Sequence, residues 1–203
     1  MLNEPENSNT HRIQRLLSLL HTRIASHDSA CASELGQALE RGRDSDVQLP
    51  AAKVPACAFM PEAIAGLDQA LRKTLTLAAD DLAWRVPGFG RLPSHLSDQM
   101  AVSVMVGPDG MVKDKHASLG LILLAPGVYY PSHKHAAEEL YLVLSGTLEW
   151  SLDGASLGSM QIGNFIHHMS WQSHSMINGA TPALCFWGWT GDIRGTSYSM
   201  SEL

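Results

Sequence analysis

The sequence is poor in charged residues and contains no long uninterrupted apolar run. Charged residues make up 17% of the 203 positions and hydrophobic residues 45%, a balance that excludes an intrinsically disordered chain because a core can be buried. The formal net charge is −6 and the basic residues form no stripe, so nucleic acid is not an expected partner. No apolar stretch is long enough to cross a bilayer, so membrane insertion is not expected either.

Cysteine is also scarce, and its distribution limits the expected redox environment. The three cysteines, Cys31, Cys57 and Cys185, are odd in number and far apart in the sequence, which fits reduced thiols better than a disulfide framework or a zinc knuckle. Residues 1–14 are polar and acidic and lack the apolar centre of a signal peptide. We therefore expect a cytoplasmic protein.

The first half of the chain has helical periodicity. Apolar residues recur at helical spacing over 13–24, after the cap candidates Ser8 and Thr10. A shorter helix is predicted over about 28–42, and a longer one opens at Pro61 and carries its apolar face through Leu82. Each of these helices has a single apolar stripe, which must be buried against another part of the molecule.

The pattern changes to strands at about residue 100. Short β-type segments separated by glycine, proline and aspartate favour a sandwich or barrel; they cover 100–106, 117–130, 139–144, 147–152, 160–168, 174–178 and 182–190. Residues 1–95 are therefore predicted to form a helical region that packs on a barrel made by residues 96–203. The leucines of 140–144 alternate with Glu139, Tyr141 and Val143, so we expect these leucines to face the helices or a second subunit.

The most informative stretch is 127–146, which reads GVYYPSHKHAAEELYLVLSG. His133, His135, Glu139 and Tyr141 are all odd-numbered and can therefore share one strand face. Imidazole nitrogens and a carboxylate oxygen that converge on one point are ligands for a divalent transition metal. His174 is the best candidate for a ligand from another part of the chain.

These two segments resemble the two cupin motifs. The first motif is complete, with glycine, five residues, His-x-His, three residues, glutamate, six residues and glycine. In the second motif Gly163, His174 and Asn178 are in register, whereas Met169 stands where proline is usual and Trp171 where glycine is usual. The resemblance implies a mainly β protein, a cupin β-barrel (a double-stranded β-helix or jelly roll), with an N-terminal α-helical region.

The arrangement Tyr130-x-x-His133-x-His135-x-x-x-Glu139-x-Tyr141, followed by His174, resembles the cupin dimethylsulfoniopropionate (DMSP) lyases of marine bacteria, most strongly over 126–190. The resemblance implies one divalent transition metal, Zn, Fe, Mn or Co, held by His135, Glu139, Tyr141 and His174. It also implies that Tyr141 is the catalytic base and that Tyr130, His133 and Trp189 bind substrate.

The residue types suit such a carbon–sulfur lyase, of the dimethylpropiothetin dethiomethylase type. A metal can bind the carboxylate of the zwitterionic substrate and acidify its α-hydrogen. A phenolate can take that proton, dimethyl sulfide then leaves as a neutral molecule, and acrylate remains. Two alternatives stay open: another metal-dependent cupin enzyme, such as an oxygenase or isomerase, and a non-catalytic small-molecule-binding cupin. Neither the metal nor the oligomeric state is set by the sequence.

Overall fold

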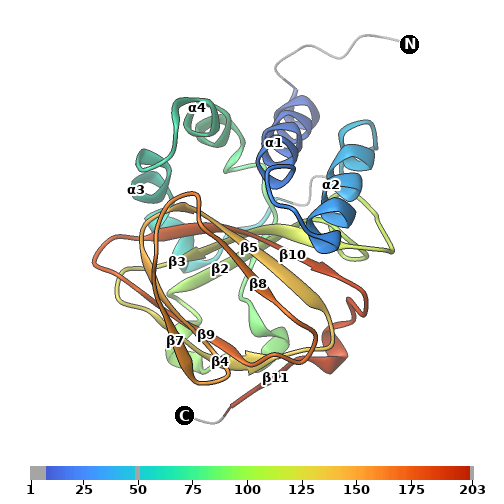
Figure 1. The fold of residues 1–203 in the computed structure, drawn as a ribbon. Coiled ribbons are helices and arrows are strands. Elements are labelled where there is room, and N and C mark those ends of the chain that lie inside the picture. The colour runs from blue at the N-terminus through green and yellow to red at the C-terminus, as the bar shows by residue number, and fades with distance from the viewer. Residues whose placement is uncertain (1–7, 49–50, 202–203) are drawn as a thin grey trace.

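A computed structural model describes residues 8–48 and 51–201 of the chain. Two antiparallel sheets face each other and form a barrel, and the helices lie together on one outer side of it (Figure 1). The predicted mainly β architecture with an N-terminal helical region is therefore confirmed. Residues 1–7, on which part of the signal-peptide argument rests, and residues 49–50 lie outside the described ranges.

The strands form two sheets with the orders β1-β2-β3-β10-β5-β8 and β11-β4-β9-β6-β7. The first sheet consists of Trp84–Arg85 (β1), Met100–Val106 (β2), Ser118–Leu124 (β3), Ala183–Thr190 (β10), Glu138–Ser145 (β5) and Phe165–His168 (β8). The second consists of Ser199–Met200 (β11), Tyr129–Lys134 (β4), His174–Asn178 (β9), Leu148–Leu152 (β6) and Ala155–Met160 (β7). The predicted segments at 117–130 and 160–168 are each two strands, because turns at Gly127 and Gly163, both with positive φ, separate them.

In the described part of the chain, four α-helices precede the barrel: Asn9–Ile24 (α1), Ala30–Arg43 (α2), Met60–Ala65 (α3) and Gln69–Ala78 (α4). Short 3₁₀ turns cover Pro55–Phe59 (η1), Gly88–Gly90 (η2), Ser94–Leu96 (η3) and Gly195–Ser197 (η4). Ser8 caps α1, since its hydroxyl accepts a hydrogen bond from the N–H of His11.

The prediction of one long helix from Pro61 to Leu82 is wrong. Gly66 ends α3, and the Asp68 carboxylate then accepts hydrogen bonds from the N–H groups of Ala70 and Leu71. An aspartate in this position satisfies the free donors of a new helix start. The apolar spacing continues across residues 66–68, because α3 and α4 bury their apolar faces on the same side, so the pattern alone does not predict two helices.

Two hydrophobic clusters divide the interior. One lies between the helices and the outer face of the first sheet, and it includes Leu140, Leu142 and Leu144, as the alternation predicted. The other lies between the two sheets and includes Tyr141 and Val143. Gly188 of β10 lets α2 approach the sheet, because a Cβ added there would lie 2.6 Å from the side chain of Leu35.

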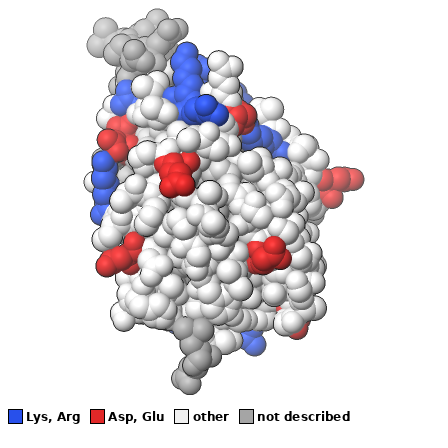
Figure 2. All heavy atoms as spheres, turned by 90° about the vertical axis from the view of Figure 1, so that its left-hand side faces the viewer, with Lys and Arg blue, Asp and Glu red and all other residues white. Residues whose placement is uncertain are grey.

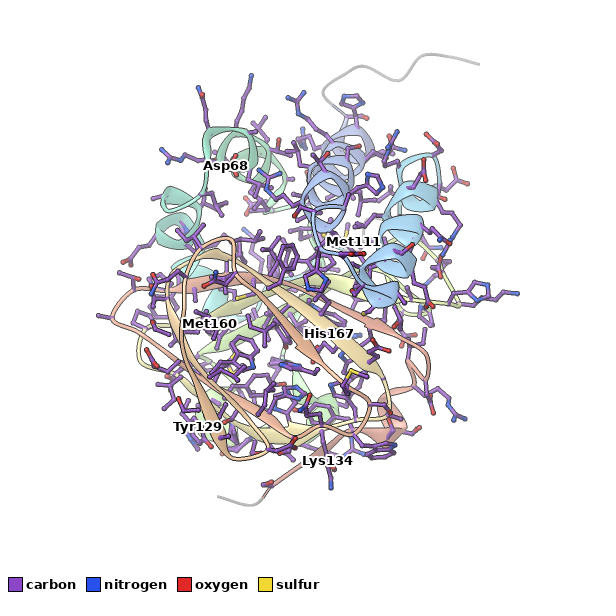
Figure 3. The ribbon with its side chains drawn as sticks, in the orientation of Figure 1. Asp68, Met111, Tyr129, Lys134, Met160 and His167 are labelled. Carbon is purple, nitrogen blue, oxygen red and sulfur yellow. The ribbon has the colours of Figure 1, made fainter. Side chains whose placement is uncertain are left out.

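Figure 3 shows the two ends of the molecule, with Asp68 among the helices and Tyr129 and Lys134, the ends of β4, at the opposite side of the barrel. In the space-filling view of one side, most of the basic side chains in sight lie toward the helical end, and the barrel part carries few charges (Figure 2). Within residues 8–48 and 51–201, no helix combines the length and the apolar character needed to cross a bilayer.

Candidate metal centre and its pocket

Three of the predicted ligands meet inside the barrel. His135 follows the end of β4, Glu139 lies on β5 and His174 begins β9. One ligand atom from each residue lies within 4.8 Å of the others, and all three residues are buried. The Nε2 atoms of His135 and His174 are each 3.2 Å from Oε2 of Glu139. The sequence therefore brings together two imidazoles and a carboxylate from three different strand ends.

Backbone carbonyl groups fix the tautomers of both histidines. Nδ1 of His135 lies 3.0 Å from the Ala137 oxygen, and Nδ1 of His174 lies 3.0 Å from the Gln172 oxygen. Because a carbonyl oxygen only accepts, each Nδ1 carries the proton, and each Nε2 of the neutral ring presents a lone pair. Nε2 of His174 has no hydrogen bond among the described residues despite its complete burial. Two nitrogen lone pairs aimed at a carboxylate oxygen fit a divalent cation, so the donor set suits a metal.

Both carboxylate oxygens of Glu139 have further partners. Oε1 accepts a hydrogen bond from Nε1 of Trp189 at 2.6 Å. Oε2 lies 3.1 Å from Nδ1 of His168, whose Nε2 accepts a hydrogen bond from Nε1 of Trp150 at 2.9 Å. Since indole is only a donor, Nδ1 of His168 carries the ring proton and donates to Glu139. His168 therefore orients the carboxylate and is not itself placed to bind a metal.

The buried groups have strongly shifted pKa values. Burial raises the pKa of Glu139, but the neighbouring His135, His168 and His174 outweigh that effect and hold it well below its ordinary value. Burial lowers the pKa of His133 well below its ordinary value, and the proximity of His174 lowers it further. Burial likewise lowers the pKa of His168 to about 4. At neutral pH Glu139 is thus a carboxylate, the form that binds a metal, and His133 and His168 are neutral.

Tyr141 lies on β5, two residues beyond Glu139, and its side chain is buried inside the barrel. Its ring packs edge-on against Trp150, with ring centroids 4.9 Å apart, and tilted against His168 at 5.6 Å. Burial, followed by the charge of Glu139, raises the pKa of its phenol well above the ordinary value. In this protein environment alone Tyr141 is a neutral phenol, and its assignments as ligand and base stay predictions.

A cavity of about 170 Å³ adjoins the site at Glu139. All the predicted substrate-binding residues, Tyr130, His133 and Trp189, line it, together with Glu139 and Tyr141. Its remaining lining residues were not predicted as site residues: Arg85, Val86, Pro87, Gly88, Phe89, Val102, Ile122, Trp187 and Tyr198. The wall is thus largely aromatic and apolar, and Glu139 and Arg85 are its acidic and basic residues.

Sequence reasoning missed several of these side chains for identifiable reasons. Tyr198 reaches the cavity because β11 pairs with β4, and its hydroxyl lies 3.0 Å from that of Tyr130. Arg85 and Phe89 come from the region predicted as helical, where β1 pairs with β2. No local spacing signals these long-range contacts. The role of His168 was accessible in principle, since Glu139 and His168 are paired across β5 and β8.

The turn before His174 keeps its geometry although it lacks the usual glycine. Trp171, at the position where the cupin motif has glycine, has a φ of 63°, in the left-handed region that glycine adopts most readily. Its backbone N–H donates to the His135 oxygen at 2.8 Å, and the Ser170 hydroxyl donates to the Ala136 oxygen at 2.6 Å. This turn therefore connects the main chain of one predicted ligand to the loop that carries another.

Comparison with known proteins agrees with this architecture. A sequence profile described as dimethylsulfoniopropionate lyase matches residues 27–185. The chain is 26% identical over 146 residues to dimethylsulfoniopropionate lyase DddQ of Ruegeria pomeroyi, covering 70% of this chain and 73% of that protein. It is 30% identical over 128 residues to the putative dimethylsulfoniopropionate lyase DddL of Cereibacter sphaeroides, covering 62% of this chain but only 53% of that protein.

Solved structures show the same fold. The crystal structure of the Ruegeria pomeroyi lyase DddQ superposes with a TM-score of 0.75 at 23% identity, covering 94% of this chain and 96% of that one. A chain from the crystal structures of the lyases RdDddP and RnDddQII gives a TM-score of 0.75 at 22% identity, covering 96% and 100%. These likenesses confirm the predicted cupin barrel, and since the profile match spans most of the sequence, the chain belongs to the dimethylsulfoniopropionate lyase family.

Proposed function

We propose that this protein cleaves dimethylsulfoniopropionate to dimethyl sulfide and acrylate by metal-dependent β-elimination. The observation that carries the proposal is the convergence of His135, Glu139 and His174 on one point beside an aromatic cavity. Family membership supplies the substrate, since the curated relatives are named as lyases acting on this compound. A divalent cation held by these three residues would supply a Lewis acid for the substrate carboxylate and would lower the pKa of nearby acids.

Tyr141 is the proposed base. Its oxygen would accept the α-proton, the electron pair of that C–H bond would form the new double bond, and the β carbon–sulfur bond would break. Dimethyl sulfide leaves as a neutral molecule, so no general acid is needed. Because burial and Glu139 keep the phenol neutral, this role requires the cation to oppose both effects. His133 is the first alternative, since its Nδ1 donates to the Pro131 oxygen at 2.8 Å and its Nε2 is left with a lone pair.

The aromatic wall is suited to the sulfonium end of the substrate. Trp187 and Trp189 both line the cavity, with ring centroids 5.7 Å apart in an edge-on arrangement. An aromatic face attracts a sulfonium by roughly 0.5–2 kcal/mol. Nε1 of Trp187 is buried and has no hydrogen-bond partner among the described residues.

Assay of the purified protein with dimethylsulfoniopropionate tests the proposal directly. We expect headspace dimethyl sulfide and an equal amount of acrylate, both lost after chelation and restored by a divalent metal. Zn, Fe, Mn and Co salts added to the stripped protein would show which ion supports turnover. Oxygen uptake by the ferrous protein would favour an oxygenase instead, and tight binding without turnover would favour a non-catalytic cupin.

Metal content tests the ligand assignment independently of activity. His135→Ala, Glu139→Ala and His174→Ala should each lose most of the metal measured by elemental analysis, because each removes one of three converging donors. Tyr141→Phe should stay largely metal-replete, because three other ligands remain. Full metal content in all three alanine variants would refute the assignment.

The role of residues 1–95 is also a proposal. Their helices share a hydrophobic cluster with the outer face of the first sheet, which supports a packing role. Because Arg85 and Phe89 also line the cavity, a truncated chain of residues 96–203 should lose activity as well as stability. A truncated chain that is monomeric and fully active would show that this region is dispensable. Cytoplasmic localisation likewise stays a prediction, to be checked by cell fractionation.

A further inference from the structure

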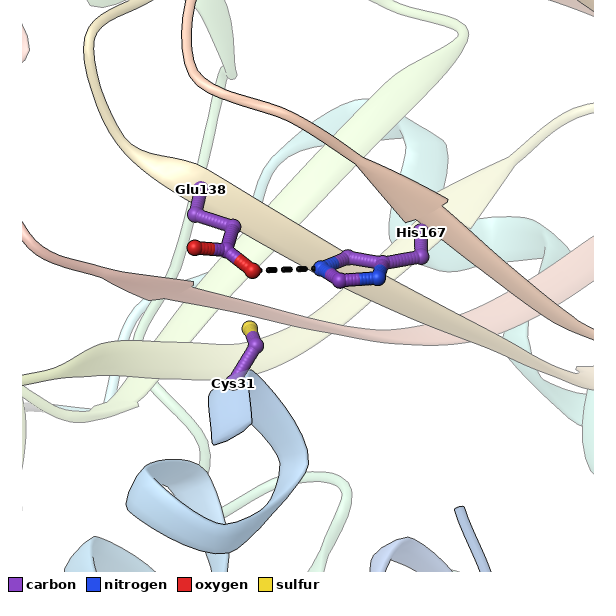
Figure 4. A group of neighbouring side chains, drawn as sticks. All are labelled: Cys31, Glu138 and His167. Atoms are coloured by element: carbon purple, nitrogen blue, oxygen red, sulfur yellow. Dashed lines mark hydrogen bonds and ion pairs between the residues drawn. The ribbon is translucent and has the colours of Figure 1, made fainter. Parts of the chain in front are cut away.

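A second group of metal-ligand side chains lies on the opposite face of the same two strands. Cys31 of α2, Glu138 of β5 and His167 of β8 each place one ligand atom within 4.8 Å of the others (Figure 4). Glu138 and His167 immediately precede Glu139 and His168, so strand alternation turns them away from the barrel interior and toward the helices.

The three side chains point to a common centre. Nε2 of His167 lies 2.7 Å from Oε1 of Glu138, and the Cys31 sulfur points toward this pair (Figure 4). In tetrahedral zinc sites, bonds of about 2.0–2.3 Å place donor atoms roughly 3.3–3.8 Å apart. The largest separation, within 4.8 Å, therefore exceeds that of a metal site by at most about 1.0–1.5 Å, and the Glu138–His167 pair at 2.7 Å would have to open by about 0.6–1.1 Å. Glu138 and His167 are about one-third exposed, 33% and 27%, so their side chains have room to move by that amount.

The chemistry of the donors suits a thiophilic divalent ion. Thiolate, imidazole and carboxylate are the three protein ligands of Zn²⁺, and a fourth position can be taken by water. The exposure of Glu138 and His167 gives solvent and an ion access from one side. Thr190 Oγ1 donates to the Cys31 sulfur across 3.6 Å, which is the kind of outer contact that orients a metal-binding thiolate.

A nucleophilic role for Cys31 fits these observations less well. The residue is only 2% exposed, and burial raises the pKa of its thiol to about 12. His167 directs Nε2 at Glu138 and so does not stand between the carboxylate and the thiol as a relay would require. We propose that Cys31, Glu138 and His167 form a second divalent metal site, of zinc type, which joins α2 to the β5–β8 ladder.

Cobalt(II) titration of the chelator-stripped, full-length protein tests this site, because cobalt replaces zinc and reports on sulfur ligation. The proposed catalytic site has no sulfur ligand, so a thiolate-to-cobalt charge-transfer band in the near ultraviolet can come only from a cysteine site. We expect two bound equivalents and this band in the unaltered protein. Cys31→Ser should lose the band and one equivalent. His135→Ala should lose an equivalent and keep the band.

Matched controls keep the outcome decisive. Cys57→Ser changes another free, partly buried cysteine and should leave the band intact. His167→Asn and Glu138→Gln should weaken zinc affinity at this site by at least about 10–100-fold, the loss seen even for outer-sphere partners. If Cys31→Ser does not fold, the zinc affinities of His167→Asn and Glu138→Gln test the proposal instead. A single equivalent without the band, a band that survives Cys31→Ser, or unchanged affinity in both other variants would overturn the proposal. None of these readouts depends on lyase activity.

Discussion

Replacing Trp189 with phenylalanine separates two roles that this side chain can have. Its ring lines the cavity, and its indole N–H donates to Oε1 of Glu139 at 2.6 Å. Phenylalanine keeps an aromatic face for the sulfonium but removes the N–H group. If cation–π attraction were the whole contribution, phenylalanine would be milder than alanine. Because phenylalanine and alanine both lack the N–H group that binds Glu139, we expect both variants also to bind the metal more weakly.

The size of the effect follows from the burial of the acceptor. Glu139 is 2% exposed, and a hydrogen bond to a buried charged group contributes about 1.5–3 kcal/mol. For a chain of this length, 1 kcal/mol corresponds to roughly 2–4 °C in Tm, so the lost bond should lower Tm by about 3–12 °C. Metal affinity should also fall by about 10–100-fold, because Glu139 loses the partner that orients it.

Trp187→Phe is the matched control. Trp187 is buried on the same strand, lines the same cavity and loses the same ring volume, but its N–H has no partner among the described residues. The difference between the two variants in calorimetric Tm and in metal titration therefore isolates the Glu139 hydrogen bond. Equal losses in both variants would refute the reasoning, since a common packing cost would then explain everything.

Tyr141→Phe should fold and keep its metal while kcat falls by at least about 10²-fold. The variant should also lose the increase in rate with pH that ionisation of the phenol produces. Near-normal turnover would indicate that His133, not Tyr141, is the base. His168→Leu should weaken metal binding by about 10–100-fold, and His168→Asn, which can still donate to the carboxylate, should recover part of the affinity measured by titration. Burial lowers the pKa values of His133 and His168, so below about pH 6.5 the unfolded chain binds more protons than the folded chain. Between about pH 6.5 and the lowered folded pKa, the free energy of unfolding should fall by about 1.4 kcal/mol per pH unit for each of the two residues. Denaturant titrations at pH 7 and 5.5 measure this fall, and equal stability at both pH values would contradict it. Gly188→Ala should lower the free energy of unfolding by about 1–3 kcal/mol, because the added methyl group would clash with Leu35. In a double-mutant cycle Leu35→Ala should relieve part of this loss, whereas strictly additive effects would argue against close packing of α2 on the sheet at Gly188.

Local periodicity separated the helical part of the chain from the strands, whereas the cupin barrel itself was predicted from the two motifs. The alternation in 139–144 correctly assigned the leucines to the helical side and Tyr141 to the barrel interior, because a strand has only two faces. Ser8 and Thr10 were both cap candidates by residue type, and the cap of α1 is Ser8. The break between α3 and α4 was not recognisable, since Asp68 sits inside an unbroken apolar pattern and its capping role depends on where the chain turns.

The site was predictable only as far as its residues are close in sequence or belong to a known motif. His135 and Glu139 are four residues apart, and the register of the second motif pointed to His174. Cys31 and Tyr198 reach their partners through packing of α2 on the sheet and through pairing of β11 with β4, and neither contact leaves a trace in local spacing. Glu138 and His167 are 29 residues apart in the sequence, so local spacing gives no sign that they meet.

The turn at Trp171 has a consequence for how such sites are recognised in other sequences. The side chains of Met169 and Trp171 are more than half exposed, at 57% and 54%, and the contact that Trp171 makes to His135 runs through its backbone N–H. At these two positions the turn thus depends on torsion angles and a main-chain donor, while the side chains of Met169 and Trp171 are free to diverge. Searches that require proline and glycine at these two positions would pass over chains in which the spacing of the ligands is fully preserved.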